Sequence, residues 1–322
     1  MTTTSTPPAK VTGHAAPAGR PPRRAAGGGR RGNGGFVLAC LLPALVLFVV
    51  FMVIPTVNVF RTSLYAWSGF SPNPRFVGFD NFTKLFGDEQ FLRSFQNTIA
   101  LLVVVTIVTM GVALFLAAVM TRQRMRGRNL YRFVLYVPSV LSVVVIAGVF
   151  SAVYDQQNGL LNGTLRALSL ETWQQIWLGD QQIVLYSVAF AMVWQSLGYY
   201  MVLYMSSMAV IPEDFYEAAA LDGASAARQF FDITLPLIWQ NLRTTLTFFI
   251  MSAVNLSFVL VRAMTGGGPD GSSEVLLSYM YKQAYTNSTY GYGMAIGVVI
   301  FAFSFLVSLL VSRATKREPL QF

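Results

Sequence analysis

The chain has 322 residues, of which 54% are hydrophobic and only 11% are charged, and its mean hydropathy is +0.52. An average soluble domain is about a quarter charged, so this composition indicates a polytopic membrane protein. The formal net charge is +9, but the basic residues cluster beside apolar runs, which positive-inside topology explains better than nucleic-acid binding. A single cysteine, Cys40, and a single histidine, His14, exclude a disulfide framework and disfavour a metal site. We therefore expect no metal and no nucleic-acid partner.

The chain begins with a segment that is too polar to fold. Residues 1–35 are rich in Gly, Pro, Ala, Thr and Arg and cannot bury enough apolar surface to offset chain entropy. The apolar run that follows is too long for the hydrophobic part of a signal peptide. We therefore expect a disordered, basic cytoplasmic tail.

A helix needs about 20 mostly apolar residues to cross a bilayer. Six runs meet this requirement, and they cover residues 36–60, 98–120, 133–153, 183–210, 242–261 and 294–311. We expect an all-α fold with six transmembrane helices. The first helix at 36–60 would be followed by an extracytoplasmic connector at 61–97, a transmembrane core at 98–312 and a cytoplasmic tail at 313–322.

The distribution of basic residues predicts the orientation of these helices. Sixteen of the 23 Lys and Arg residues lie in the two tails or next to the connectors that follow the second and fourth runs. The other seven are Arg61, Arg75, Lys84, Arg93, Arg166, Arg262 and Lys282. By the positive-inside rule both termini, and the connector around residue 220, should lie in the cytoplasm.

That connector is a polar, small-residue segment between two long apolar runs. Pro212 suits the first turn of a helix, and Glu213 and Asp214 then lie where the helix dipole favours negative charge. Gly223 fits a left-handed break after this helix, and residues 224–232 can form a second short helix. We expect a bent helix pair on the membrane surface, with an alanine face that another protein can approach closely.

The same connector carries a motif, E-A-A-A-L-D-G-A followed by I-T-L-P. It resembles the EAA loop of ABC importer membrane subunits, specifically the maltose-type sugar permeases, and the outer segment F-V-G-F-D-N-F at 76–82 is also similar to that family. The resemblance implies a type I ABC importer permease fold in which the loop, here 212–236, is a coupling helix that docks into a groove on a cytoplasmic ATPase. The coupling residues it implies are Glu217, Ala218, Ala219, Leu221, Asp222, Gly223 and Pro236.

The energy source is expected to lie on another chain. No Asp, Glu, Lys or His lies in the interior of the six runs, whereas proton- or ion-driven transporters usually keep such groups at membrane depth. No Walker motif is present, and no nucleophile–base pair indicates an enzyme. We therefore expect a chain that binds no cofactor itself, with Mg-ATP held by partner ATPase subunits.

Polar and aromatic residues in the fourth and fifth runs are candidates for contacts with a substrate. Aromatic faces with neutral hydrogen-bonding groups match the apolar ring faces and hydroxyl rims of sugars, and the resemblance implies a pathway lined by these two helices. The candidates are Trp194, Ser196, Tyr199, Tyr200, Asn255 and Ser257. Helix packing remains the alternative for each of them, and Gly198 favours packing.

The predicted function is that of a permease subunit of an ATP-driven importer in the bacterial cytoplasmic membrane. It would take up a mono- or oligosaccharide delivered by an extracytoplasmic binding protein. The resemblance implies that its partners are a second, different permease chain and two ABC ATPase subunits, and the apolar runs imply contact with the lipid bilayer. The alternatives are an ABC permease for glycerol phosphate, amino acids or peptides, an ion-coupled secondary carrier, and a structural membrane scaffold.

Overall fold

The computed structural model describes residues 2, 34–122 and 127–316. The described residues divide into two units between Ile54 and Pro55, and the predicted tail at 1–35 lies outside them except for residues 2, 34 and 35. In the first unit, helix α1 (Gly34–Phe48) continues into a π-helical turn at Val49–Val53. The apolar side chains of residues 37–53 are exposed on all sides, which is typical of a helix whose surroundings are lipid or another membrane subunit.

The second unit is helical, with one small hairpin. Its helices, the first of which starts at the boundary, are α2 (Ile54–Thr62), α3 (Asp80–Phe86), α4 (Glu89–Arg122), α5 (Arg128–Val140), α6 (Val143–Val153), α7 (Leu160–Ala167), α8 (Val184–Met208), α9 (Asp214–Leu221), α10 (Ala226–Gln229), α11 (Leu235–Leu237), α12 (Trp239–Met264), α13 (Leu276–Tyr281) and α14 (Tyr290–Ala314). The antiparallel hairpin pairs β1 (Tyr65–Ala66) with β2 (Arg75–Phe76). Single turns are a 3₁₀ turn at Glu171–Trp173 and π-helical turns at Phe230–Thr234 and Lys282–Thr286.

Five stretches of the described chain are long and apolar enough to cross a membrane: Val37–Thr62, Glu89–Thr121, Val184–Met208, Trp239–Met264 and Tyr290–Ala314. Helices α5 and α6 supply a sixth span if they are counted together, although they bend by 103° at their junction. The prediction of an all-α protein with six spanning runs is confirmed, with the third run broken in two.

The break in the third run follows Pro138. The sequence predicts one helix over 133–153, but α5 ends at Val140 and α6 begins at Val143. Pro138 cannot donate a backbone hydrogen bond and so weakens the last turn of α5. Leu141 then takes an extended conformation, with φ −71° and ψ 146°, which turns the chain before α6 starts.

Helix α4 begins at Glu89, well before the start of the apolar run at residue 98. The carboxylate of Asp88 accepts hydrogen bonds from the backbone N–H groups of Gln90 at 3.0 Å and Phe91 at 3.2 Å, which satisfies donors that have no partner within the helix. The predicted connector 61–97 therefore ends at Asp88, because hydropathy alone misses the polar first turns of this helix.

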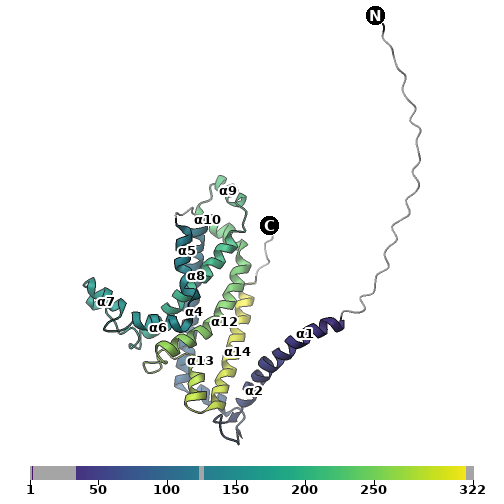
Figure 1. Ribbon diagram of the computed structural model, residues 1–322, viewed down its shortest axis with the longest axis vertical. Helices are drawn as coiled ribbons and strands as arrows, with labels where there is room; N and C mark the ends of the chain where they lie inside the picture. The colour runs from purple at the N-terminus through teal and green to yellow at the C-terminus, as the bar shows by residue number, and fades with distance from the viewer. Residues whose placement is uncertain (1, 3–33, 123–126, 317–322) are drawn as a thin grey trace. The chain divides into compact units, whose positions relative to one another are not determined.

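The main core lies where α4, α8 and α12 pack together, and these helices run side by side in Figure 1. Tyr204 of α8 is completely buried there. Its hydroxyl donates to the sulfur of Met110 in α4 at 2.8 Å and lies 3.0 Å from Thr245 Oγ1 in α12. One side chain therefore joins three membrane helices.

The loop between α12 and α14 folds back against α4. The side-chain amide of Asn97 donates to the carbonyls of Ser272 at 3.0 Å and Glu274 at 2.9 Å. Thr98 Oγ1 accepts a hydrogen bond from the backbone N–H of Leu276 at 2.9 Å. This segment, between the fifth and sixth apolar runs, is thus partly buried, since α4 side chains satisfy its backbone.

Candidate functional site

The segment that carries the E-A-A-A-L-D-G-A motif forms α9. The Glu213 carbonyl accepts hydrogen bonds from the N–H groups of Tyr216 at 2.9 Å and Glu217 at 3.1 Å, so the helix is capped at Glu213. Pro212 precedes this cap and does not lie in the first turn, in contrast to the sequence prediction. Asp214 does lie there, where the helix dipole stabilises negative charge.

Gly223 ends α9 in the left-handed conformation that the sequence predicts, with φ +78°. The next residue, Ala224, donates its N–H to the carbonyl of Ala219 at 2.9 Å. This bond closes a Schellman-type turn, which pairs a carbonyl that the helix itself leaves free. The chain then reverses into α10, which Ser225 caps by accepting from the Arg228 N–H at 3.4 Å.

Most of the predicted coupling residues lie on α9 and its terminal turn. Glu217, Ala218, Leu221, Asp222 and Gly223 are exposed, whereas Ala219 is half-buried. Leu221 stands out because 90% of it is exposed, and an uncovered apolar residue beside small alanines suits contact with another protein. The structure does not bring Pro236 to this surface, because Pro236 lies half-buried in α11.

The predicted substrate-pathway residues of α8 are mostly engaged in packing. Trp194 contacts Phe150 of α6 edge-on, with ring centroids 5.3 Å apart. Tyr200 is buried and packs edge-on against Phe249 of α12 at 5.0 Å. Ser196 is also buried, and its hydroxyl donates to the side chain of the adjacent Gln195 at 3.1 Å.

Two of the predicted pathway residues remain accessible. Tyr199 of α8 and Asn255 of α12 are exposed, and their polar groups make no hydrogen bond to another described residue. Ser257 is buried, and its hydroxyl donates to the Val254 carbonyl at 2.8 Å. Of the six candidates, Tyr199 and Asn255 are therefore exposed, Trp194 is half-buried, and the remaining three are buried within this chain. Ser252, one turn before Asn255 and also exposed, belongs with the exposed pair, although no motif singled it out.

Gly198 lies against α5, as the packing interpretation predicts. A Cβ atom at this position would overlap the backbone of Leu135 and Tyr136. The close approach of α5 and α8 therefore requires a glycine here, which is the role of small residues between membrane helices.

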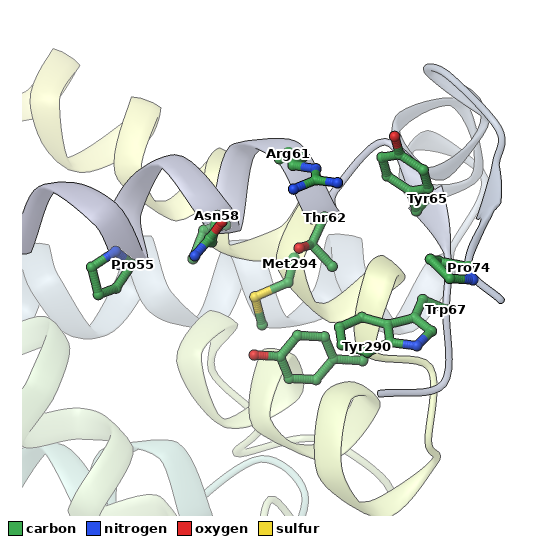
Figure 2. Close-up of a pocket in the computed structure, with 10 residues that line it drawn as sticks. Pro55, Asn58, Arg61, Thr62, Tyr65, Trp67, Pro74, Tyr290 and Met294 are labelled. Carbon is green, nitrogen blue, oxygen red and sulfur yellow. The ribbon is translucent and has the colours of Figure 1, made fainter. Parts of the chain in front are cut away.

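A cavity of about 540 Å³ lies between α2, the hairpin and the start of α14 (Figure 2). Arg61 and Thr62 border it from α2, while Trp67 and Tyr290 pack edge-on with ring centroids 5.3 Å apart. None of the predicted pathway residues lines this cavity. It is therefore a feature separate from the candidate substrate pathway on α8 and α12.

Glu274 is an important residue that the sequence does not reveal. It is only 2% exposed, and its carboxylate accepts a hydrogen bond from Ser278 and lies 3.8 Å from the Lys282 ammonium. Burial raises the pKa of Glu274, and the Ser278 hydrogen bond and the Lys282 and Arg262 charges offset only part of this effect. G-S-S-E reads as a surface loop, so no local signal predicts a buried carboxylate.

Asp88 is a second acidic residue with a structural role. Its carboxylate accepts hydrogen bonds from the hydroxyls of Tyr279 in α13 and Tyr292 in α14. Burial tends to raise the pKa of Asp88, but these two hydrogen bonds and those from the backbone of α4 outweigh it and lower the pKa. An aspartate before Glu-Gln is a helix-capping signal that sequence reasoning could have used.

Comparison with known proteins agrees with this architecture. A family described as "Binding-protein-dependent transport system inner membrane component" matches residues 110–317. The diacetylchitobiose uptake system permease protein NgcF of Streptomyces coelicolor is 35% identical over 286 residues, which cover 86% of this chain and 81% of that protein. The probable ABC transporter permease protein YurN of Bacillus subtilis is 37% identical over 279 residues, covering 86% of this chain and 94% of that one.

A solved structure shares the fold. It is that of a bacterial alginate ABC transporter in complex with an alginate pentasaccharide-bound periplasmic protein, and one of its chains superimposes with a TM-score of 0.77. The match covers 89% of this chain and 96% of that chain at 21% sequence identity. The chain therefore belongs to the binding-protein-dependent transport system inner membrane components, and it is a multi-pass permease subunit of an ABC transporter.

Proposed function

We propose that the chain is a permease subunit of an ATP-driven importer for a neutral mono- or oligosaccharide. The names of its relatives support a sugar, since one belongs to a diacetylchitobiose uptake system. The accessible candidates on α8 and α12, Tyr199, Ser252 and Asn255, are neutral, and a sugar needs hydrogen-bond donors and acceptors but no charge. The exposed cation of α12, Arg262, lies near the end of the helix and stacks on the Tyr281 ring. A second permease chain would complete the pathway, with Tyr199 and Asn255 facing it.

The observation that carries the coupling role is the exposed surface of α9. Glu217, Ala218 and Leu221 present a carboxylate, a small side chain and an uncovered leucine, which suits a socket on a cytoplasmic ATPase subunit. Mg-ATP would bind to that ATPase subunit and not to this chain. When ATP binds, the socket would move and α9 would move with it. Contacts between α9 and the socket that differ between the inward- and outward-facing states would then shift the equilibrium between those two states of the membrane helices.

The proposal places α9 on the cytoplasmic side of the bacterial inner membrane, in agreement with the distribution of basic residues. The sugar would arrive on the other side with an extracytoplasmic binding protein. The orientation can be tested with a Glu217→Cys variant in a Cys40→Ser background, because Cys40 is the single native cysteine. A membrane-impermeant maleimide should label this variant in inverted vesicles and not in intact cells, and the reverse result would contradict the proposal.

The coupling role is tested by uptake of labelled sugar in cells that express the complete transporter. Glu217→Lys and Gly223→Val should leave the protein in the membrane and abolish uptake. Asp80→Lys makes a similar charge change at an exposed position of α3 and should preserve uptake. Normal uptake by both α9 variants would refute the coupling role. Unlabelled sn-glycerol 3-phosphate that competed better than neutral sugars would refute the proposed substrate class.

A further inference from the structure

The connector between α6 and α8, residues 154–182, forms a small folded arm that includes α7 (Figure 1). Asn162 holds it together and is only 1% exposed. Its amide donates to the carbonyls of Gln156 at 3.2 Å and Gln175 at 2.9 Å. Its oxygen accepts from Trp177 Nε1 at 2.8 Å. Asn162 thus joins the segment after α6 to the segment before α8.

Further hydrogen bonds hold the arm on the end of α8. Ser187 of α8 donates its hydroxyl to the Trp177 carbonyl at 2.8 Å, and Tyr154 donates to the Ser187 carbonyl at 3.2 Å. Asp155 accepts from the N–H groups of Gln157 at 3.1 Å and Asn158 at 2.7 Å. The backbone of the arm is therefore fixed by its own side chains, so a ligand would meet a preformed surface.

A hollow of about 560 Å³ lies between the two segments, within the range of about 300–1,000 Å³ usual for ligand sites. Its wall is formed by the side-chain amides of Gln156, Gln157, Asn158, Gln174 and Gln175, with Arg166 and Asp180. None of these five amides makes a side-chain hydrogen bond to another described residue. The hollow therefore presents donors and acceptors that only water or a ligand can satisfy.

The chemistry of this wall favours an uncharged ligand with many hydroxyl groups. Each amide offers two donors and an acceptor, and each can pair with hydroxyls of a sugar ring. The wall holds one cation and one anion, so its formal charges cancel and it does not select an anion. Arg166 donates to the Gln157 carbonyl, and Asp180 accepts from the Gln182 N–H at 2.7 Å. Ile176 is the one apolar residue of the lining, so the wall contacts a ligand mainly through polar groups.

We infer that this arm hollow is a second sugar-binding site, outside the candidate pathway on α8 and α12. The inference rests on the proposed function, since it takes the transported molecule to be a neutral sugar. The arm precedes α8 and α9 follows it, and α8 has 25 residues, or about 37 Å at 1.5 Å per residue. The arm therefore lies at the far end of α8 from the coupling surface, where a sugar would arrive.

Calorimetry on the complete transporter in lipid nanodiscs, without its binding protein, tests the inference. The probes are diacetylchitobiose and maltose. The wild-type protein should bind one of them, and a Gln157→Ala, Gln174→Ala double variant should weaken the affinity about tenfold or more, equivalent to about 1.4 kcal/mol. The matched control is a Gln181→Ala, Gln182→Ala double variant, which removes two exposed amides outside the hollow and should bind as the wild type does.

Three outcomes would overturn the inference. The first is equal affinity in the hollow variant and the wild type. The second is no binding of either probe by a wild-type transporter that takes one of them up when its binding protein is added. The third is a hollow variant that loses capture of the binding protein but keeps its affinity for sugar. Sugar uptake is measured in parallel in liposomes of the same lipid composition as the nanodiscs, with the binding protein present. If the proposed function is wrong, the wild-type transporter takes up no sugar in that assay, which distinguishes this failure from the three outcomes above.

Discussion

The hydroxyl of Tyr216 lies 2.9 Å from Thr234 Oγ1, and this contact joins α9 to the π-helical turn that follows α10. Thr234 is buried, whereas Glu217 and Leu221 are exposed. Gln229, also buried, donates its amide to the Ala224 carbonyl at 3.1 Å. These hydrogen bonds therefore attach the inner side of α9 to the rest of the chain, and the outer side of α9, which carries Glu217 and Leu221, is accessible to a partner.

Tyr216→Phe should weaken this attachment without changing the outer surface. Loss of one such hydrogen bond costs about 0.5–1.5 kcal/mol, so we expect fewer sugars transported per ATP hydrolysed, with ATPase activity retained. The ratio is measured in proteoliposomes. Tyr131→Phe, at an exposed position of α5, is the control and should leave the ratio unchanged. An unchanged ratio in Tyr216→Phe would show that the contact does not contribute to coupling.

Gly223 should be replaceable by asparagine but not by alanine. No atom lies within 4 Å of a Cβ placed on Gly223, so the cost of substitution comes from the left-handed backbone alone. That cost is about 1–2 kcal/mol for most residues and less for asparagine. We expect uptake to fall in Gly223→Ala and to be largely kept in Gly223→Asn. Equal uptake by the two variants would mean that the turn tolerates another conformation.

Gly198→Ala should destabilise the protein because the added methyl group would meet the backbone of α5. Overpacking of this kind costs about 1–3 kcal/mol. Gly111→Ala in α4 is the matched control, because nothing lies within 4 Å of its Cβ, and alanine there should stabilise the helix by about 0.5–1 kcal/mol. Thermal unfolding in detergent should therefore shift in opposite directions for the two variants.

The stability of the protein should depend on the ionisation of Glu274. Because folding raises the pKa of this group above its ordinary value of 4.5, its contribution to stability is full below that value and is lost as the pH rises through the folded pKa. Glu274→Gln cannot ionise, so its Tm relative to wild type should increase from pH 5 to pH 8. Glu171→Gln, at an exposed position, should show no such trend, and a flat difference for Glu274→Gln would contradict the prediction.

The membrane helices and the coupling segment could be predicted because their signals are local. A long apolar run specifies a span whatever surrounds it. Gly223 follows a run of helix-forming residues and adopts φ +78° as expected, since few other residues tolerate this conformation. The left-handed turn therefore follows from a few consecutive residues.

The features that could not be predicted depend on contacts between distant residues. Glu274 is buried because its loop folds onto Asn97, 177 positions away in the chain. Tyr199 is exposed and Tyr200 is buried because the side of α8 that carries Tyr200 packs against Phe249 of α12. The sharp bend after Pro138 depends on the conformation of Leu141, and many prolines in membrane helices cause only a kink.

Tyr204 has a consequence for how the subunit can move. Its ring and hydroxyl fix the rotation of α8 about its own axis relative to both α4 and α12. Twisting α8 alone would break both contacts and leave the buried hydroxyl without a partner, which costs about 1–3 kcal/mol. Twisting α4 or α12 alone would break one of the two contacts. Reorientation during a transport cycle should therefore carry these three helices as one rigid body, with displacement taken up at the α5–α6 corner and at the junctions around α9.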